Sequence, residues 1–73
     1  MAQVAAIGEE LRIQGLALAG VITCPAETAE DNRSAWRSLG DETAVVILTP
    51  RAASFLSGEL HWRTGVLTVV MPP

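Results

Sequence analysis

The sequence predicts an α/β fold with a small, open, parallel sheet of four strands and helices on both of its faces. Four short runs rich in Val, Ile, Leu and Ala predict the strands, at Gln3–Ile7, Val21–Cys24, Ala44–Thr49 and Val66–Met71. Each interval between these runs is long enough for the helical crossover that a parallel connection requires. The third run is continuously apolar, which is typical of a central strand that is covered on both faces.

Residues that start and stop helices occupy the second and third intervals. Thr28 followed by Asp31 predicts an N-cap with an acidic third helical residue. Thr49 followed by Pro50 predicts a second N-cap, and Gly58 stands where that helix would stop. Right-handed crossovers between successive strands then give a shortened version of the flavodoxin-like strand order, 2-1-3-4.

The segment GLALAGV, residues 15–21, contains two glycines with different expected roles. We expect the first helix to run from Glu9 to Ala19, with Gly20 ending it in the left-handed conformation. Gly15 falls inside this helix, where a glycine costs about 1 kcal/mol relative to alanine. The sequence therefore predicts that Gly15 allows a close approach of the helix to the sheet.

The first predicted helix is apolar on two sides. One stripe holds Leu11, Gly15, Leu18 and Ala19, and the opposite one holds Ile13, Leu16 and Ala17. Only one side can rest on the sheet of so small a domain, so we expect the other to meet another protein. The second predicted strand is the natural edge of the sheet and needs cover. The predicted partner interface therefore comprises Ile13, Leu16, Ala17, Val21, Ile22 and Cys24.

The second predicted helix has a single apolar side, which is typical of a surface helix packed on a sheet. This side comprises Ala29, Asn32, Ala35, Trp36 and Leu39. Because Trp36 shares the stripe with Ala35 and Leu39, we expect it to belong to the core and not to a contact surface.

Length, composition and charge exclude several classes of protein. A chain of 73 residues allows one domain, residues 1–73, and its 49% hydrophobic content predicts a globular fold. The net charge of −3, without lysine and with scattered arginines, argues against nucleic acid as a partner. The first ten residues lack the basic region of a secretory signal, and the longest apolar run is too short to span a bilayer. A single cysteine fits a reducing, cytosolic setting.

Ligands of open α/β folds bind at the carboxyl ends of the strands, where the strand order reverses. In this sequence that place lies between the first and third strands, at Gly8, Glu9, Glu10, Thr49, Pro50 and Arg51. The two glutamates are similar to the Mg²⁺-binding acidic pair of receiver domains. However, Thr49 and Pro50 stand where a receiver has its phospho-accepting aspartate, and no lysine is present. We therefore interpret the glutamates as acidic residues that stabilise a helix N-terminus.

No motif predicts catalysis, a metal site or a bound cofactor. Neither the dinucleotide-binding glycine pattern nor the phosphate-binding loop is present. Cys24 ends a strand and is interpreted as a half-buried small residue, not a nucleophile. The segment with His61, Trp62 and Arg63 is expected to be a solvated turn. The alternative is an exposed recognition cluster, since Trp and Arg are enriched at binding hot spots.

Nearly the whole chain resembles the F subunit of archaeal- and vacuolar-type (V/A-type) rotary ATPases. The resemblance is carried by VAAIGEE (4–10), QGLALAGVITCPA (14–26), AVVILTP (44–50) and LTVVMPP (67–73). It implies a receiver-like fold and a non-catalytic subunit of the central stalk, cytoplasmic and peripheral to the membrane. Such a subunit binds the coiled-coil D subunit and turns with it inside the ring of catalytic subunits of a proton- or sodium-translocating ATPase. Family members continue into a C-terminal segment linked to regulation, whereas this sequence ends at Pro73.

Two other hypotheses stay open at the level of sequence. One is a degenerate receiver-like module for signalling or protein interaction, suggested by Glu9 and Glu10. The other is a small enzyme that uses the crevice between the first and third strands, which no residue pattern favours. Self-association of the isolated chain is a further expectation, because a core of this size gives marginal stability.

Overall fold

The computed structural model describes residues 2–60 and 63–73 and has the predicted fold class. Its strands are β1 (Gln3–Gly8), β2 (Ile22–Pro25), β3 (Thr43–Leu48) and β4 (Leu67–Val70). All neighbouring strands pair in parallel, in the order β2-β1-β3-β4. Each strand begins and ends within one residue of its predicted position, and β3 is central as predicted.

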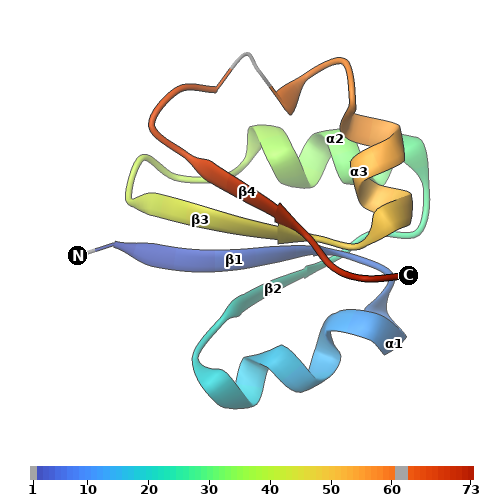
Figure 1. The fold of residues 1–73 in the computed structure, drawn as a ribbon, viewed down its shortest axis with the longest axis horizontal. Helices are drawn as coiled ribbons and strands as arrows, with labels where there is room; N and C mark the ends of the chain where they lie inside the picture. Colours follow the sequence, from blue (N-terminus) through green and yellow to red (C-terminus); the bar gives the residue numbers. More distant parts are fainter. Residues whose placement is uncertain (1, 61–62) are drawn as a thin grey trace.

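The helices lie on both faces of the sheet (Figure 1). The connection from β1 to β2 contains α1 (Glu10–Ile13) and a 3₁₀ helix, η1 (Gln14–Ala19), on one face. The other face carries α2 (Ala29–Arg37) and α3 (Pro50–Leu56), which contact each other. This division follows from right-handed crossovers, because the chain moves outward from β1 to β2 and then returns past β1 to β3.

The main core lies between the sheet and the pair α2 and α3. Its buried residues are Ile7, Ala26, Trp36, Val46, Leu48, Ala52 and Leu56. Ile7 and Leu48 are direct neighbours in the register of β1 and β3, so both side chains point to the same face. Trp36 is 4% exposed, which confirms its assignment to the core.

Both predicted N-caps are confirmed. The hydroxyl oxygen of Thr28 accepts a hydrogen bond of 3.0 Å from the backbone N–H of Asp31. The hydroxyl oxygen of Thr49 accepts one of 3.2 Å from the N–H of Ala52, and Pro50 is the first residue of α3. Each cap satisfies an N–H group that has no partner within its own helix.

The predicted continuous helix from Glu9 to Ala19 is wrong in its second half. The α-helix ends at Ile13 and the chain continues as a 3₁₀ helix to Ala19. A 3₁₀ helix rises about 2.0 Å per residue, more than an α-helix, so the segment covers a longer path beneath the sheet. Gly20 ends it with a φ of 84°, which confirms the predicted left-handed stop.

The orientation of this segment also differs from the prediction. Gly15 is exposed, and a Cβ atom built on it would meet nothing within 4 Å, so the expected close approach to the sheet is absent. The stripe with Gly15 faces solvent, where Leu11 is 83% and Leu18 95% exposed. Ile13, from the opposite stripe, is fully buried. The segment buries the side that carries the bulky branched residue, because that side removes more apolar surface from water.

Substituting alanine for two glycines is expected to change stability in opposite directions. Gly8→Ala should lower the free energy of unfolding by about 1–3 kcal/mol, because the new Cβ would overlap the fully buried Thr49 side chain. Gly15→Ala should raise it by about 0.4–1 kcal/mol, because that site is open and its φ is not positive. Urea unfolding of both variants measures the two changes. A loss of stability in Gly15→Ala would contradict the described position of η1.

Candidate interaction surface

The place where open α/β folds bind ligands is closed here by a hydrogen bond between two side chains. The Thr49 hydroxyl, fully buried at the end of β3, donates to Oε1 of Glu9 over 2.5 Å. The backbone N–H of Thr49 donates to the carbonyl of Ile7 over 3.2 Å. These two bonds join the segments that follow β1 and β3, so the crevice predicted from the sequence is occupied by the protein's own groups.

The other residues of the predicted crevice turn to different neighbours. Glu10 is exposed, and its backbone N–H donates to Oε2 of Glu27 over 3.0 Å. The guanidinium of Arg51 lies 5.8 Å from the centre of the Phe55 ring. Within residues 2–60 and 63–73, no group of three or more His, Cys, Asp or Glu side chains is placed to hold a metal ion. The Glu9 carboxylate is therefore bonded to Thr49, whereas Glu10 contacts Glu27 through its backbone N–H.

The hydrogen bond from Thr49 lowers the pKa of the Glu9 carboxyl group below its ordinary value of 4.5. The backbone N–H of Glu9 and the positive charges of Arg12 and Arg51 act in the same direction, while desolvation acts against them. A lowered pKa means that the folded state prefers the ionised form. This stabilisation is complete above the pKa of the unfolded chain and is lost as the pH falls through the folded-state pKa.

We therefore expect wild-type protein to lose stability on acidification below about pH 4.5, with a contribution from Glu9. Glu9→Gln cannot ionise, so its free energy of unfolding should fall less between pH 6 and pH 3. Urea unfolding at several pH values measures both slopes. Glu10→Gln is the matched control, because it leaves the bond between Glu9 and Thr49 in place and should retain the contribution from Glu9. Identical slopes in wild type and Glu9→Gln would show that the bond to Thr49 does not favour the ionised form.

Arg63 closes the C-terminal end of α2 and is not a free recognition residue. Its Nη1 donates to the carbonyl of Trp36 over 3.2 Å, and its Nη2 donates to the carbonyls of Leu39 and of Gly40, the latter over 3.1 Å. The guanidinium also lies 6.0 Å from the centre of the Trp36 ring. The last carbonyls of a helix lack partners within it, and a cation there also interacts favourably with the helix dipole.

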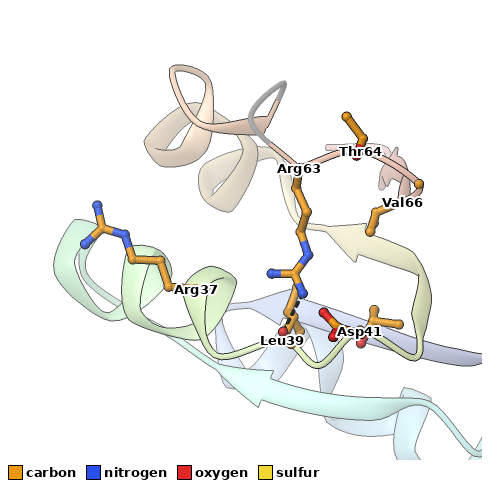
Figure 2. A pocket seen from close by; sticks show the side chains of 8 residues that line it. Arg37, Leu39, Asp41, Arg63, Thr64 and Val66 are labelled. Carbon is orange, nitrogen blue, oxygen red and sulfur yellow. Dashed lines mark hydrogen bonds between the residues drawn. The ribbon is translucent and has the colours of Figure 1, made fainter.

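A shallow hollow of about 560 Å³ borders this arginine (Figure 2). Figure 2 shows Arg63 extending from its loop to the end of α2, while Arg37 points away from the hollow. Arg37 instead forms an ion pair of 3.3 Å with Glu59. The Arg63 guanidinium already donates its N–H groups to backbone carbonyls, so we do not interpret the hollow as a ligand site built around this arginine. His61 and Trp62, the other members of the predicted recognition cluster, lie outside the described residues.

Exposed large apolar side chains are the most distinctive feature of the surface. Across the described residues, 2–60 and 63–73, they are Leu11, Leu18, Ile22, Leu67, Val69 and Val70. The two leucines belong to α1 and η1, which contact β1 and β2 on their face of the sheet. Figure 1 shows no other helix on that face, so the same side of β3 and β4 is left without a covering helix. Ile22 and Val70 pair, through Ala5 and Leu48, with residues that face the main core, so the six side chains do not form one patch. Leu11 and Leu18 share one short segment and are the most exposed of the six, so they are the candidate interaction surface.

The structure places the six predicted interface residues in different environments. Ile13 is fully buried beneath the sheet and cannot contact a partner, so its assignment was wrong. Ala17 and Ile22 are exposed, and Leu16, Val21 and Cys24 are half-buried. Burial also raises the pKa of the Cys24 thiol, in agreement with its predicted role as a small packing residue.

Sequence reasoning missed Leu11 and Leu18 as exposed residues and Arg63 as a helix cap. Gly15 could have indicated that Leu11 and Leu18 are exposed, because they share its stripe. A stripe that contains a glycine buries less apolar area than a stripe of isoleucine and leucine. The cap had no local signal, because Arg63 contacts carbonyls 23–27 residues earlier in the chain.

No protein-family model matches this sequence, and no curated protein matches it either. The function proposed below rests on the sequence resemblance to the F subunit and on the exposed side chains of Leu11 and Leu18. In the described part of the chain, no helix is long and apolar enough to cross a membrane.

Proposed function

We propose that this protein is a non-catalytic subunit of the central stalk of a V/A-type rotary ATPase. It would bind the coiled-coil D subunit and turn with it inside the ring of catalytic subunits. Binding would couple ATP hydrolysis or synthesis to rotation in a proton- or sodium-translocating enzyme. The protein would then be cytoplasmic and peripheral to the membrane as part of that complex.

The observation that carries this proposal is the exposure of Leu11 and Leu18, which are 83% and 95% exposed. Leu18 lies in the segment GLALAGV, which is also the most specific part of the resemblance. Fully burying a leucine is worth about 1.5–3 kcal/mol, so two exposed leucines on one short segment represent a considerable gain for a partner that covers them. An apolar helical surface of this kind fits the hydrophobic seam of another helix.

The segment that presents the leucines is held firmly to the rest of the protein. Ile13, fully buried, fixes α1 beneath the sheet, and Gly20 fixes the end of η1. Nη2 of Arg12 also donates to the carbonyl of Pro72 over 2.7 Å, which ties α1 to the chain after β4. Such preorganisation reduces the ordering cost of association.

Co-expression with the coiled-coil D subunit of a V/A-type rotary ATPase tests the proposal. We expect a stoichiometric complex that survives affinity purification and size-exclusion chromatography. An unrelated coiled coil of similar length, expressed in the same way, should not co-purify. Failure to co-purify with the D subunit, while the chain itself is folded by circular dichroism, would contradict the proposed function.

A further inference from the structure

We propose that the isolated chain forms a symmetric dimer through the outer edge of β4. In this dimer, β4 (Leu67–Val70) pairs antiparallel with β4 of a second copy, and the two-fold axis passes through Val69. Two four-stranded sheets would thereby join into one continuous sheet. The inference concerns the chain alone and does not depend on the proposed function.

The first support is the position of β4 in the sheet. Among the residues that the structure describes, β4 is the last strand in the order β2-β1-β3-β4 and pairs with β3 alone. Natural edge strands are normally protected by charged residues, proline or a bulge. The four residues LTVV contain no proline and no charge, and their pairing with β3 shows no register shift. Leu67 and Val70 are 63% and 51% exposed.

The backbone of β4 determines which groups face outward. The N–H of Met71 donates to the carbonyl of Leu48 over 2.8 Å, so the backbone groups of Met71 face β3. In a parallel ladder the residues that bond to a given neighbour alternate, so Leu67 and Val69 also face β3. The N–H and C=O groups of Thr68 and Val70 consequently point to the open edge.

These two residues form a self-complementary set. If Thr68 lies opposite Val70 of a second copy, each such pair exchanges two N–H···O=C bonds, which gives four bonds about an axis at Val69. The two Val69 residues then face each other as a non-hydrogen-bonded pair, in which side chains approach closely. Pro72 has no N–H and occupies the next outward position, so pairing stops there and the register is restricted.

Charge and space also favour a second copy at this edge. The chain carries a net charge of −3, yet residues 64–73 contain no charged side chain, so two edges can approach without local repulsion. The helices make their main contacts away from β4: α3 packs chiefly on α2, β1 and β3, while α1 and η1 pack on β1 and β2. The opposite edge is less suitable, because β2 ends in Pro25, which cannot donate to a ladder.

Disulfide trapping tests the axis directly. In a Cys24→Ser background, Val69→Cys should form a covalent dimer under mild oxidation, because Cα atoms of a non-hydrogen-bonded pair lie about 4.5 Å apart, within disulfide range. Thr68→Cys is the matched control, since its counterpart would lie on a diagonal about 7–8 Å away. We expect at least 10-fold faster cross-linking of Val69→Cys than of Thr68→Cys or the highly exposed Leu18→Cys. Equal rates, or faster cross-linking at Thr68, would overturn the proposal.

Sedimentation of the wild-type chain provides the second readout. Its average mass should rise with concentration toward twice the 7.7 kDa of the monomer. Thr68→Pro removes one outward N–H from each copy at a position that an edge strand tolerates, so it should weaken the dimer at least 10-fold while circular dichroism stays native. A wild type that remains monomeric at millimolar concentration, or a dimer that Thr68→Pro leaves unchanged, would overturn the proposal. Both readouts use the chain alone and are independent of binding to the D subunit.

Discussion

Arg63→Ala is expected to lower the free energy of unfolding by about 2–3 kcal/mol. The substitution removes the guanidinium N–H groups that meet the carbonyls of Trp36, Leu39 and Gly40 at the end of α2. Hydrogen bonds to charged groups contribute about 1.5–3 kcal/mol, although the carbonyls of Trp36 and Gly40 keep the backbone N–H groups of Leu39 and Thr43 as donors. A domain of this length has only roughly 4–11 kcal/mol of stability, so the loss would be evident in a urea melt.

Arg63→Lys separates charge from geometry. It keeps the positive charge near the end of the helix, but an ammonium group cannot reach three carbonyls as a planar guanidinium does. We expect it to recover less than half of the loss. Arg37→Ala is the surface control, because Arg37 makes an exposed ion pair, and it should change stability by no more than about 1 kcal/mol. A lysine variant as stable as wild type would contradict the role given to the guanidinium.

Ile13→Ala is expected to lower the free energy of unfolding by about 2–5 kcal/mol, whereas Leu11→Ala and Leu18→Ala should change it by no more than about 0.5 kcal/mol. Ile13 is fully buried, so truncation leaves a cavity between α1 and the sheet. Leu11 and Leu18 are almost fully exposed and lose little packing when truncated. Denaturant unfolding of the three variants measures this contrast.

The contrast also tests the orientation of the segment from Glu10 to Ala19. The sequence places Leu11 and Leu18 in one stripe and Ile13 in the other, and it predicted that the stripe with Gly15 meets the sheet, whereas the structure buries Ile13. If Leu18→Ala were as destabilising as Ile13→Ala, the leucine stripe would be the buried one. The surface proposed for partner binding would then be wrong.

The architecture was accessible from the sequence because its signals are local. Continuous apolar runs predict the strands, and the caps at Thr28 and Thr49 depend on atoms three residues away. The strand order followed from the handedness of crossovers, which is a general property of β-α-β units. These features require no knowledge of distant contacts.

The candidate sites were less accessible because they depend on contacts between distant parts of the chain. The Glu9–Thr49 bond joins residues 40 positions apart, and it turns an apparent crevice into a closed junction. The bonds of Arg63 turn an apparent recognition residue into a helix cap. The change from α-helix to 3₁₀ helix after Ile13 shifts the angular positions of Leu16 and Leu18, so an ideal α-helical wheel could not assign them correctly.

The proposed function depends on Leu11 and Leu18, so affinity for the D subunit should be measured for wild type and for the double variant Leu11→Gln/Leu18→Gln. Losing two buried leucines from an interface should raise the dissociation constant on the order of 100-fold or more, while the free energy of unfolding stays within about 0.5 kcal/mol of wild type. Glu30→Gln/Arg33→Gln on the opposite face of the sheet is the matched control and should bind as wild type does. A double leucine variant that is stable and binds the D subunit with unchanged affinity would contradict the account.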